Sequence, residues 1–295
     1  MGQGTNLTAG DLPFTDAGIK TFARIGRLSG NAATGNIQFA YSMESQDCYR
    51  FVGKTVTLSF YYRTGANFSG TSLSDFIYTG TGIDQAARNG FTGGTYPGVG
   101  TCSPNTSWQR VSLRCEIGSN MNQIGLSFQY TPVGTAGAAD YFDITGVQLE
   151  LGSVATPFEV RPFPVELQMC QRYLCVFKST SNKYISLGLA VGQSAFIARA
   201  IINLPVSLRS LTPTLISNDV SISWGSGAVF VGPIKVWNGT TYAPTNIQTN
   251  PSYIVPENTT AFYFELIFAS GIAAGVSYSL FMETGNNFLH IDAEL

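Results

Sequence analysis

The strongest constraint on the fold is an alternation of apolar and polar residues with a period of two. In residues 55–64, apolar Leu58 and Phe60 alternate with polar Thr57 and Ser59. Such spacing places the two sets of side chains on opposite faces of a β-strand. The same alternation recurs in residues 111–117, 124–130 and 141–151. We therefore predict an all-β fold, with Leu58, Phe60, Leu113, Phe128 and Leu149 in one core.

Two details concern how these strands connect. Within residues 141–151 the apolar positions change parity at Gly146, which predicts a β-bulge there. Residues 111–117 and 124–130 flank a short turn, so we expect them to form a hairpin or a meander. Strands at this spacing with Gly-rich connections are typical of a jelly-roll β-sandwich.

The chain divides near a proline-rich segment. Residues 153–164 contain three prolines, and residues 165–173 carry apolar residues at helical spacing without a breaker. The segments beyond alternate again and predict a second β-sandwich, with hairpin turns at 191–194 and 269–275. We predict a jelly-roll domain over 1–161, a linker with a short helix over 162–178 and a C-terminal β domain over 179–295.

The amino-acid composition limits which classes of binding partner this chain can have. Charged residues make up 12% of the chain, about half the usual share, and the net charge is −2. The few basic residues do not cluster, which argues against nucleic-acid binding, and no apolar run is long enough for membrane insertion. We also expect no secretory signal at the amino terminus. Few charges need desolvation when copies of such a chain pack together, which favours self-association.

The residues needed for common catalytic sites are scarce. The single histidine, His290, lies in a predicted strand, and no cluster of His and Cys has metal-ligand spacing. Asp140 and Asp143 could serve a glycosidase or a hard cation, but we expect them to lie at a solvated strand edge. The five cysteines form no CxxC pair, and we expect reduced thiols. We predict no catalytic residue, no metal site and no cofactor.

One predicted sheet face carries aromatic and basic residues. If the apolar residues of 111–117 point inward, Trp108, Arg110 and Arg114 point outward, and the same argument places Tyr61 and Arg63 outward beside them. Such residues could form a glycan-binding platform. They are also enriched at subunit interfaces, which is the interpretation that we favour.

A second candidate surface is the Gly- and Thr-rich stretch 79–101. It predicts a long excursion between strands, with Phe91 and Tyr96 at an exposed tip. The alternative is a loop that packs under its own aromatic side chains.

Several strings of this sequence resemble phage tail-fibre and related virion proteins that contain a carbohydrate-binding-module-like jelly roll. The most specific are VQLELGSVATPFE at 147–159 and CQRY at 170–173; others are FARI at 22–25, GKTVTLSFY at 53–61, GANFS at 65–69, SWQR at 107–110 and YTPVGTAGAADYF at 130–142. The similarity covers residues 19 to 175, and less specifically extends to the closing IDAEL at 291–295. It implies a jelly roll, a place on the virion and a homotrimer.

These observations predict a structural virion protein of a bacteriophage, assembled in the cytoplasm of the host. We expect a trimeric tail-fibre or receptor-contacting component without catalysis, which contacts other virion proteins and could bind a host surface glycan. A capsid-decorating or head-fibre protein is the structural alternative. A small polysaccharide depolymerase is the enzymatic one.

Overall fold

The computed structural model divides the chain into two compact units, Met1–Val160 and Arg161–Leu295. It describes residues 2–3, 19–179, 185–195, 197–209 and 273–282, together with the strands at 214–217, 221–222, 229–230, 234–237, 247–248, 261–267 and 288–292. Each unit consists mainly of antiparallel strands.

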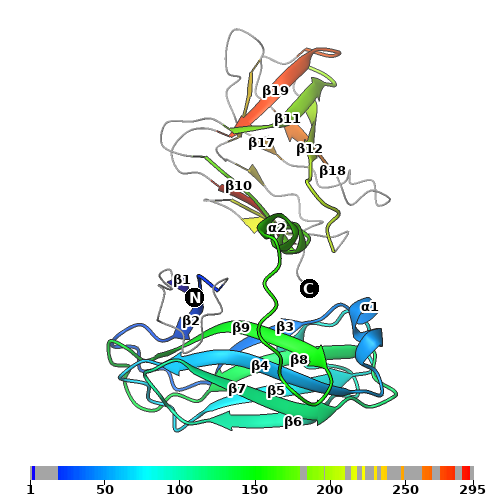
Figure 1. The fold of residues 1–295 in the computed structure, drawn as a ribbon. Coiled ribbons are helices and arrows are strands. Elements are labelled where there is room, and N and C mark those ends of the chain that lie inside the picture. The colour runs from blue at the N-terminus through cyan, green and yellow to red at the C-terminus, as the bar shows by residue number, and fades with distance from the viewer. Residues whose placement is uncertain are drawn as a thin grey trace. The chain divides into compact units, whose positions relative to one another are not determined.

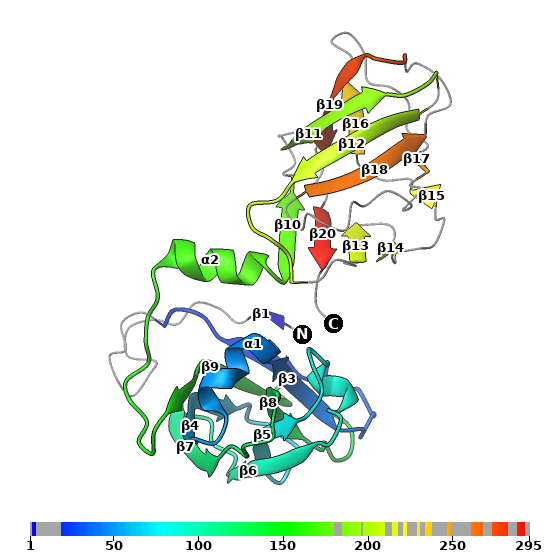
Figure 2. The same ribbon diagram turned by 90° about the vertical axis from the view of Figure 1, so that its right-hand side faces the viewer.

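The first unit is a sandwich of two antiparallel sheets (Figures 1 and 2). One sheet has the order β1-β2-β9-β4-β7, with strands Gly2–Gln3, Ala23–Gly26, Tyr141–Leu151, Thr55–Thr64 and Gln109–Glu116. The other has the order β3-β8-β5-β6, with strands Ile37–Ser42, Gln123–Tyr130, Leu73–Gly80 and Thr95–Cys102. From β2 to β9 every connection except β5 to β6 passes from one sheet to the other. This is jelly-roll topology, and it confirms the predicted fold class.

The core lies between the two sheets. Leu58, Phe60 and Phe128 are 0 to 2% exposed, and the rings of Phe60 and Phe128 are 4.8 Å apart. Leu113 and Leu149 pack against this cluster while partly buried. The alternation of apolar residues therefore identified the inward face of the strands correctly.

The predicted bulge at Gly146 is confirmed. Ser59 pairs with Gln148 and Tyr61 with Thr145, so that β9 has one more residue than β4 in this interval. Gly146 has a φ of +58°, the left-handed conformation that glycine adopts readily in such a bulge. The extra residue restores the facing of the apolar side chains of β9.

The predicted hairpin or meander of residues 111–117 and 124–130 is wrong. Strand β7 pairs with β4, whereas β8 pairs with β3 and β5 in the opposite sheet. The connection between them therefore turns a corner of the sandwich. Both strands direct apolar residues at the same core, and alternation alone does not say from which side.

Short helical segments lie in or beside the first unit: α1 (Ser45–Cys48), η1 (Tyr49–Phe51) and η2 (Ala87–Asn89). The helix α2 (Phe163–Gln171) begins the second unit, close to its predicted position. Among the described residues, no helix is long and apolar enough to span a membrane.

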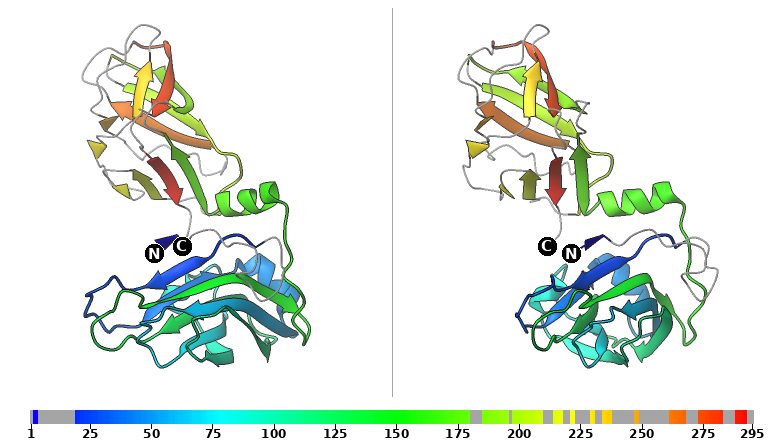
Figure 3. Two further views of the ribbon diagram at one scale, coloured as in Figure 1. Left: turned by 60° about the vertical axis from the view of Figure 1, so that its left-hand side comes forward. Right: turned by 90° about the vertical axis from the view of Figure 1, so that its left-hand side faces the viewer.

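The second unit holds two larger antiparallel sheets and a two-stranded ribbon. The first sheet has the order β10-β20-β13-β14, with strands Leu174–Lys178, Phe288–Asp292, Thr214–Ser217 and Ser221–Ile222, and Figure 3 shows green β10 beside red β20. The second has the order β16-β19-β11-β12-β18, with strands Ile234–Trp237, Ser277–Met282, Ile185–Gly192, Ile197–Asn203 and Ala261–Ile267. The ribbon joins β15 (Val229–Phe230) to β17 (Ile247–Gln248).

The two hairpins predicted in this unit have different outcomes. Strands β11 and β12 pair directly, which confirms the turn at 191–194. Strands β18 and β19 do not pair, because β11 and β12 lie between them in the sheet. The hairpin predicted at 269–275 is therefore wrong; sequence neighbours can share a sheet without being partners in it.

Candidate functional site

The aromatic and basic face predicted on β4 and β7 is largely covered. Tyr61 is 1% and Trp108 5% exposed, because Phe22 and Ile19 pack over them. The expectation that these two aromatic side chains are exposed is wrong. Alternation identifies the outward face of a sheet, but a segment distant in sequence decides whether solvent reaches that face.

The segment around Thr156 covers the other half of the same face. Arg110 donates hydrogen bonds to the hydroxyl of Ser59 and to the carbonyl of Thr156. Thr156 in turn donates to Glu150 through both its backbone N–H and its hydroxyl, at 2.8 and 2.6 Å. Arg110 is therefore part of the attachment of this segment, whereas Arg114 is exposed.

Arg63 belongs to a charge cluster on this face that is centred on the buried carboxylate of Asp143. Its Nε donates a hydrogen bond to Asp143 Oδ2 at 2.9 Å. Arg24 donates two hydrogen bonds to the same carboxylate, at 2.8 and 2.9 Å. The register explains the cluster, because Asp143 on β9 stands directly between Arg24 on β2 and Arg63 on β4. Asp143 is fully buried, so its expected place at a solvated strand edge is wrong.

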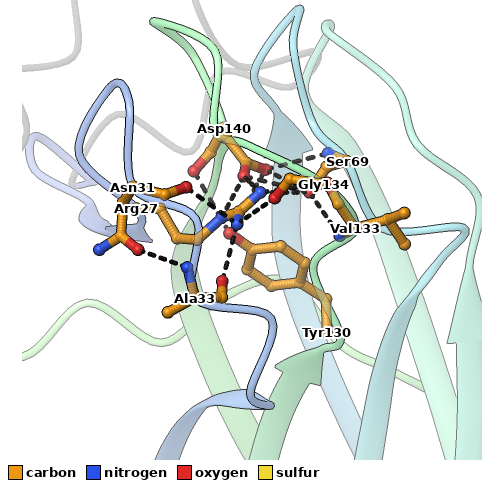
Figure 4. A network of polar contacts seen from close by, with 8 residues as sticks. All are labelled: Arg27, Asn31, Ala33, Ser69, Tyr130, Val133, Gly134 and Asp140. Carbon is orange, nitrogen blue, oxygen red and sulfur yellow. Dashed lines mark hydrogen bonds and ion pairs between the residues drawn. The ribbon is translucent and has the colours of Figure 1, made fainter.

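Asp140 is also buried, and its partner is Arg27 at 2.7 Å (Figure 4). The guanidinium donates further hydrogen bonds to Ser69 Oγ and to the carbonyl oxygens of Asn31, Ala33, Val133 and Gly134. One cation thereby ties three loops at one end of the sandwich. This arrangement is structural, because the carboxylate is fully engaged by the protein itself.

Tyr130 completes this network. Its hydroxyl lies 3.4 Å from Asp140 Oδ1. Burial, followed by the negative charge of Asp140, raises the pKa of Tyr130 to about 12. The phenol therefore stays neutral and remains a hydrogen-bond donor at physiological pH.

The outer face of the other sheet carries a groove of about 530 Å³, within the range of about 300 to 1,000 Å³ that is usual for small-molecule sites. We call this feature the β5–β6 groove. Its walls and floor come from β3, β5, β6, β8 and the loop that contains η2. The lining residues are Gln38, Phe76, Tyr78, Ala87, Arg88, Gly90, Tyr96, Val99, Ser127 and Gln129.

Aromatic rings form one side of the groove. Tyr78 stacks on Phe91 at 4.3 Å and on Tyr96 at 5.6 Å, and Tyr96 meets Phe76 edge-on at 5.8 Å. A bulge in β6 places Tyr96 and Pro97 opposite Tyr78, which brings these rings together. Tyr96 remains 64% exposed, so a firmly supported aromatic ring faces the solvent.

Amide side chains supply hydrogen-bonding groups to the same groove. Gln129 accepts a hydrogen bond from Asn36 through Oε1 at 2.8 Å, which leaves its amide N–H groups for a ligand. Gln38 donates through Nε2 to Ser127 at 2.8 Å, which leaves its carbonyl oxygen as an acceptor. Donor and acceptor therefore stand on neighbouring strands, since Gln38 and Gln129 are paired in the register.

The loop from β5 to β6 is held by specific contacts. Asp84 and Ser45 exchange two hydrogen bonds of 2.9 Å, and Gln85 and Thr92 exchange two more of 2.8 and 2.9 Å. The hydroxyl of Tyr78 donates to the carbonyl of Ala87, and burial raises the pKa of Tyr78 to about 12. The wall of the groove is thus fixed in place although it is built from a loop.

The two predicted loop-tip residues have different positions. Phe91 is 8% exposed and lies under the loop against Tyr78, so its expected exposure is wrong and the loop packs on its own aromatic side chain. Tyr96 is exposed, as expected, but on strand β6. Gln38, Phe76 and Gln129 also line the groove but were not predicted as site residues. Of these, Gln129 lies on a strand expected from the sequence, 124–130, where its outward parity was the available signal. No strand was expected around Gln38 or Phe76.

No residue arrangement typical of catalysis lines the groove, whose described lining contains no Asp, Glu, His or Cys. Elsewhere in the described part of the chain, no group of three or more His, Cys, Asp and Glu residues is placed to hold a metal ion. The five cysteines are free thiols, of which only Cys170 is exposed. Burial raises the pKa of Cys48 to about 11 and that of Cys102 to about 12.

Comparisons with known proteins give little further information. No family model matches the chain, and no curated protein matches it. One solved structure that is similar is the N-terminal CBM22-1-CBM22-2 tandem domain of Xyn10C from Paenibacillus barcinonensis. It is 13% identical, covers 93% of this chain and 86% of its own, and has a TM-score of 0.28, which is too low to support a shared function.

Proposed function

We propose that this chain is a non-catalytic structural protein of a bacteriophage particle, in a tail fibre or receptor-contacting tip, and that the β5–β6 groove binds a glycan of the host surface. The place in the particle rests on the sequence resemblance, above all on residues 147–159 and 170–173. The glycan rests on the groove. Assembly with other virion proteins would occur in the host cytoplasm.

The observation that carries the glycan proposal is the exposed ring of Tyr96 beside paired amides. Sugar rings present C–H faces that pack on aromatic rings, and equatorial hydroxyls that both donate and accept hydrogen bonds. Tyr96 and Phe76 offer the first kind of contact, and Gln38 and Gln129 offer the second. Because the rings and amides are held by neighbours, little side-chain freedom is lost on binding.

Binding without cleavage is favoured over the depolymerase alternative. A glycosidase of the common kind needs two carboxyl groups flanking the scissile bond, about 5 to 10 Å apart. The groove offers none, and both Asp140 and Asp143 are buried in ion pairs. Incubation of the protein with bacterial capsule or lipopolysaccharide should release no oligosaccharide; repeated release would contradict the proposal.

The test of glycan binding uses an array of bacterial surface polysaccharide fragments. Tyr96→Ala should weaken binding at least tenfold, because the stacking ring is lost. Tyr49→Ala is the matched control, since Tyr49 is 71% exposed and does not line the groove. No binding by the wild-type chain, or equal binding by both variants, would refute the groove as the glycan site.

The position in the particle needs its own test. A capsid-decorating or head-fibre protein remains the structural alternative, because the resemblance includes virion proteins beyond tail fibres. Immunogold labelling of particles that carry the gene should mark the tail. Label on the capsid would support the alternative.

We propose that the chain assembles as a homotrimer in which the α2 helices of the three copies pack against one another. No residue of α2 is buried; Phe163 is 75%, Val165 46%, Leu167 41% and Met169 46% exposed. Its nine residues are fewer than the roughly 12 to 15 that an isolated helix needs. At about 100° per residue, Val165 and Met169 lie opposite Phe163 and Leu167, so the helix needs two covering neighbours. Threefold symmetry gives each helix two copies as neighbours.

Mass and thiol reactivity test the trimer. Light scattering should give three times 31.6 kDa, and Cys170 on α2 should react slowly with a maleimide. Phe163→Glu should lower the mass and expose Cys170 to the reagent, whereas Val154→Glu, at a residue 73% exposed outside the helix, should do neither. A wild-type monomer with a reactive Cys170 would contradict the proposal.

A further inference from the structure

The β5–β6 groove contains one charged residue, Arg88, among its ten lining residues. Arg88 lies in η2, and its side chain is exposed. Among the described residues it has no hydrogen-bond, ion-pair or ring partner. A cation without a partner, on the wall of a groove that contains no carboxylate, is available to an anion from outside the protein.

Most arginines of the first unit are engaged by the protein itself. Arg24, Arg27 and Arg63 form ion pairs with buried aspartates. Arg110 bonds to the segment that covers β4, and Arg50 lies over the ring of Phe51. Arg88 and Arg114 lack such partners, and of these two it is Arg88 that lines the β5–β6 groove.

The backbone that carries Arg88 is fixed. The N–H of Ala87 donates to Ser42 Oγ at 2.6 Å, and the carbonyl of Ala87 accepts from the buried Tyr78. The N–H groups of Asn89 and Gly90 donate to Ala86 and Ala87 at 3.1 Å. The base of the Arg88 side chain is therefore held at the groove while the guanidinium remains free to engage a ligand.

We propose that the groove selects an acidic saccharide, and that Arg88 pairs with the carboxylate of a uronic or other sugar acid while Tyr96 supports its ring. This inference rests on the proposed glycan function and specifies its ligand class. A guanidinium matches a planar carboxylate with two parallel hydrogen bonds, which adds orientation as well as attraction. The amides of Gln38 and Gln129 then meet neutral hydroxyls of the same glycan.

The test is an array on which each acidic fragment of a bacterial polysaccharide is printed beside its carboxyl-reduced counterpart, with sulfated and phosphorylated fragments as separate sets. The wild-type chain should bind carboxylated fragments about ten- to a hundredfold better than their reduced counterparts, as expected for a charge-assisted contact. Arg88→Gln should remove that preference, because its binding to the acidic fragments should fall to the level of its binding to the reduced ones. Arg88→Lys should retain part of it.

Arg114→Gln is the matched control, because Arg114 is exposed on β7 and does not line the groove. Equal binding of acidic and reduced fragments, binding only of sulfated or phosphorylated ones, or an unchanged preference in Arg88→Gln would overturn the inference while leaving glycan binding intact. Absence of binding to every fragment would overturn the proposed glycan function together with it.

Discussion

Removing the guanidinium of Arg27 should destabilise the first unit severely. The side chains of Arg27 and Asp140 are 2% and 0% exposed, so this ion pair is buried on both sides. A surface pair would contribute about 0 to 1 kcal/mol, whereas breaking a buried pair by removing one partner costs about 3 to 5 kcal/mol. Exposure decides between the two, and we expect Arg27→Met to lose about 4 kcal/mol of the free energy of unfolding.

The assay is urea unfolding of the full chain, followed by the fluorescence of Trp108 with Trp224 and Trp237 replaced by Phe in every protein compared. Trp108 is buried in the first unit and reports on that unit. For a unit of this size, about 4 kcal/mol corresponds to a Tm lower by about 8 to 16 °C. Arg114→Met, the same replacement at an exposed site, should change stability by less than about 0.5 kcal/mol.

A second variant separates the lost charge pair from lost packing. Asp140→Asn in the Arg27→Met background removes the uncompensated buried charge, and the amide oxygen can still accept from the N–H of Ser69. The double variant should therefore be more stable than Arg27→Met alone. A loss below about 1 kcal/mol for Arg27→Met, or additive losses in the double variant, would refute this reasoning.

Three further changes test the first unit by the same unfolding assay. Phe60→Ala should cost roughly 3 to 5 kcal/mol, because the ring is fully buried; a loss below about 1 kcal/mol would show a misplaced core. Gly146→Ala places a new Cβ 3.0 Å from Cδ2 of the buried Tyr61 ring at a φ of +58°. It should cost more than the roughly 1 to 2 kcal/mol of Gly134→Ala, which has a similar φ of +61° and open space; equal costs would contradict the close contact. Burial raises the pKa of the Asp75 carboxyl, so the folded state holds its proton more tightly and stability falls as pH rises above about 4. Asp75→Asn should therefore exceed the wild type in stability at pH 7 and match it below about pH 4; a constant difference would argue against titration of Asp75.

The fold could be predicted from sequence where local periodicity determines it. The alternation of apolar and polar residues predicted that Leu58 and Phe60 face inward and that β9 has a bulge at Gly146. Such alternation arises in a strand with one buried face and one outer face. Parity does not determine which sheet a strand joins, so β7 and β8 were wrongly paired. Strand partners depend on contacts between distant residues, which a single sequence does not display.

The candidate site was harder to predict for the same reason. Tyr61 and Trp108 have outward parity, yet Phe22 and Ile19 cover them from the start of the chain. Arg24 and Asp143 are 119 residues apart, and only the register of β2 with β9 brings them together. Tyr96 was recognised because it lies in a Gly-rich stretch, whereas its partners on β3, β5 and β8 share no local signal with it.

The wall of the β5–β6 groove divides its tasks among different residues. Asp84 and Gln85 hold the loop through hydrogen bonds, and Gly90 allows the chain to turn because it adopts a φ of +79°. The side chain of Arg88 makes none of the contacts that hold the loop. Replacement of Arg88 therefore changes what the groove presents at little cost to folding. If the chain is a phage protein as proposed, and the hosts change their surface polysaccharides, we expect the first adaptive substitutions in this groove to occur at position 88. We expect host-range variants to diverge at position 88 and to retain the same residues at 84, 85 and 90.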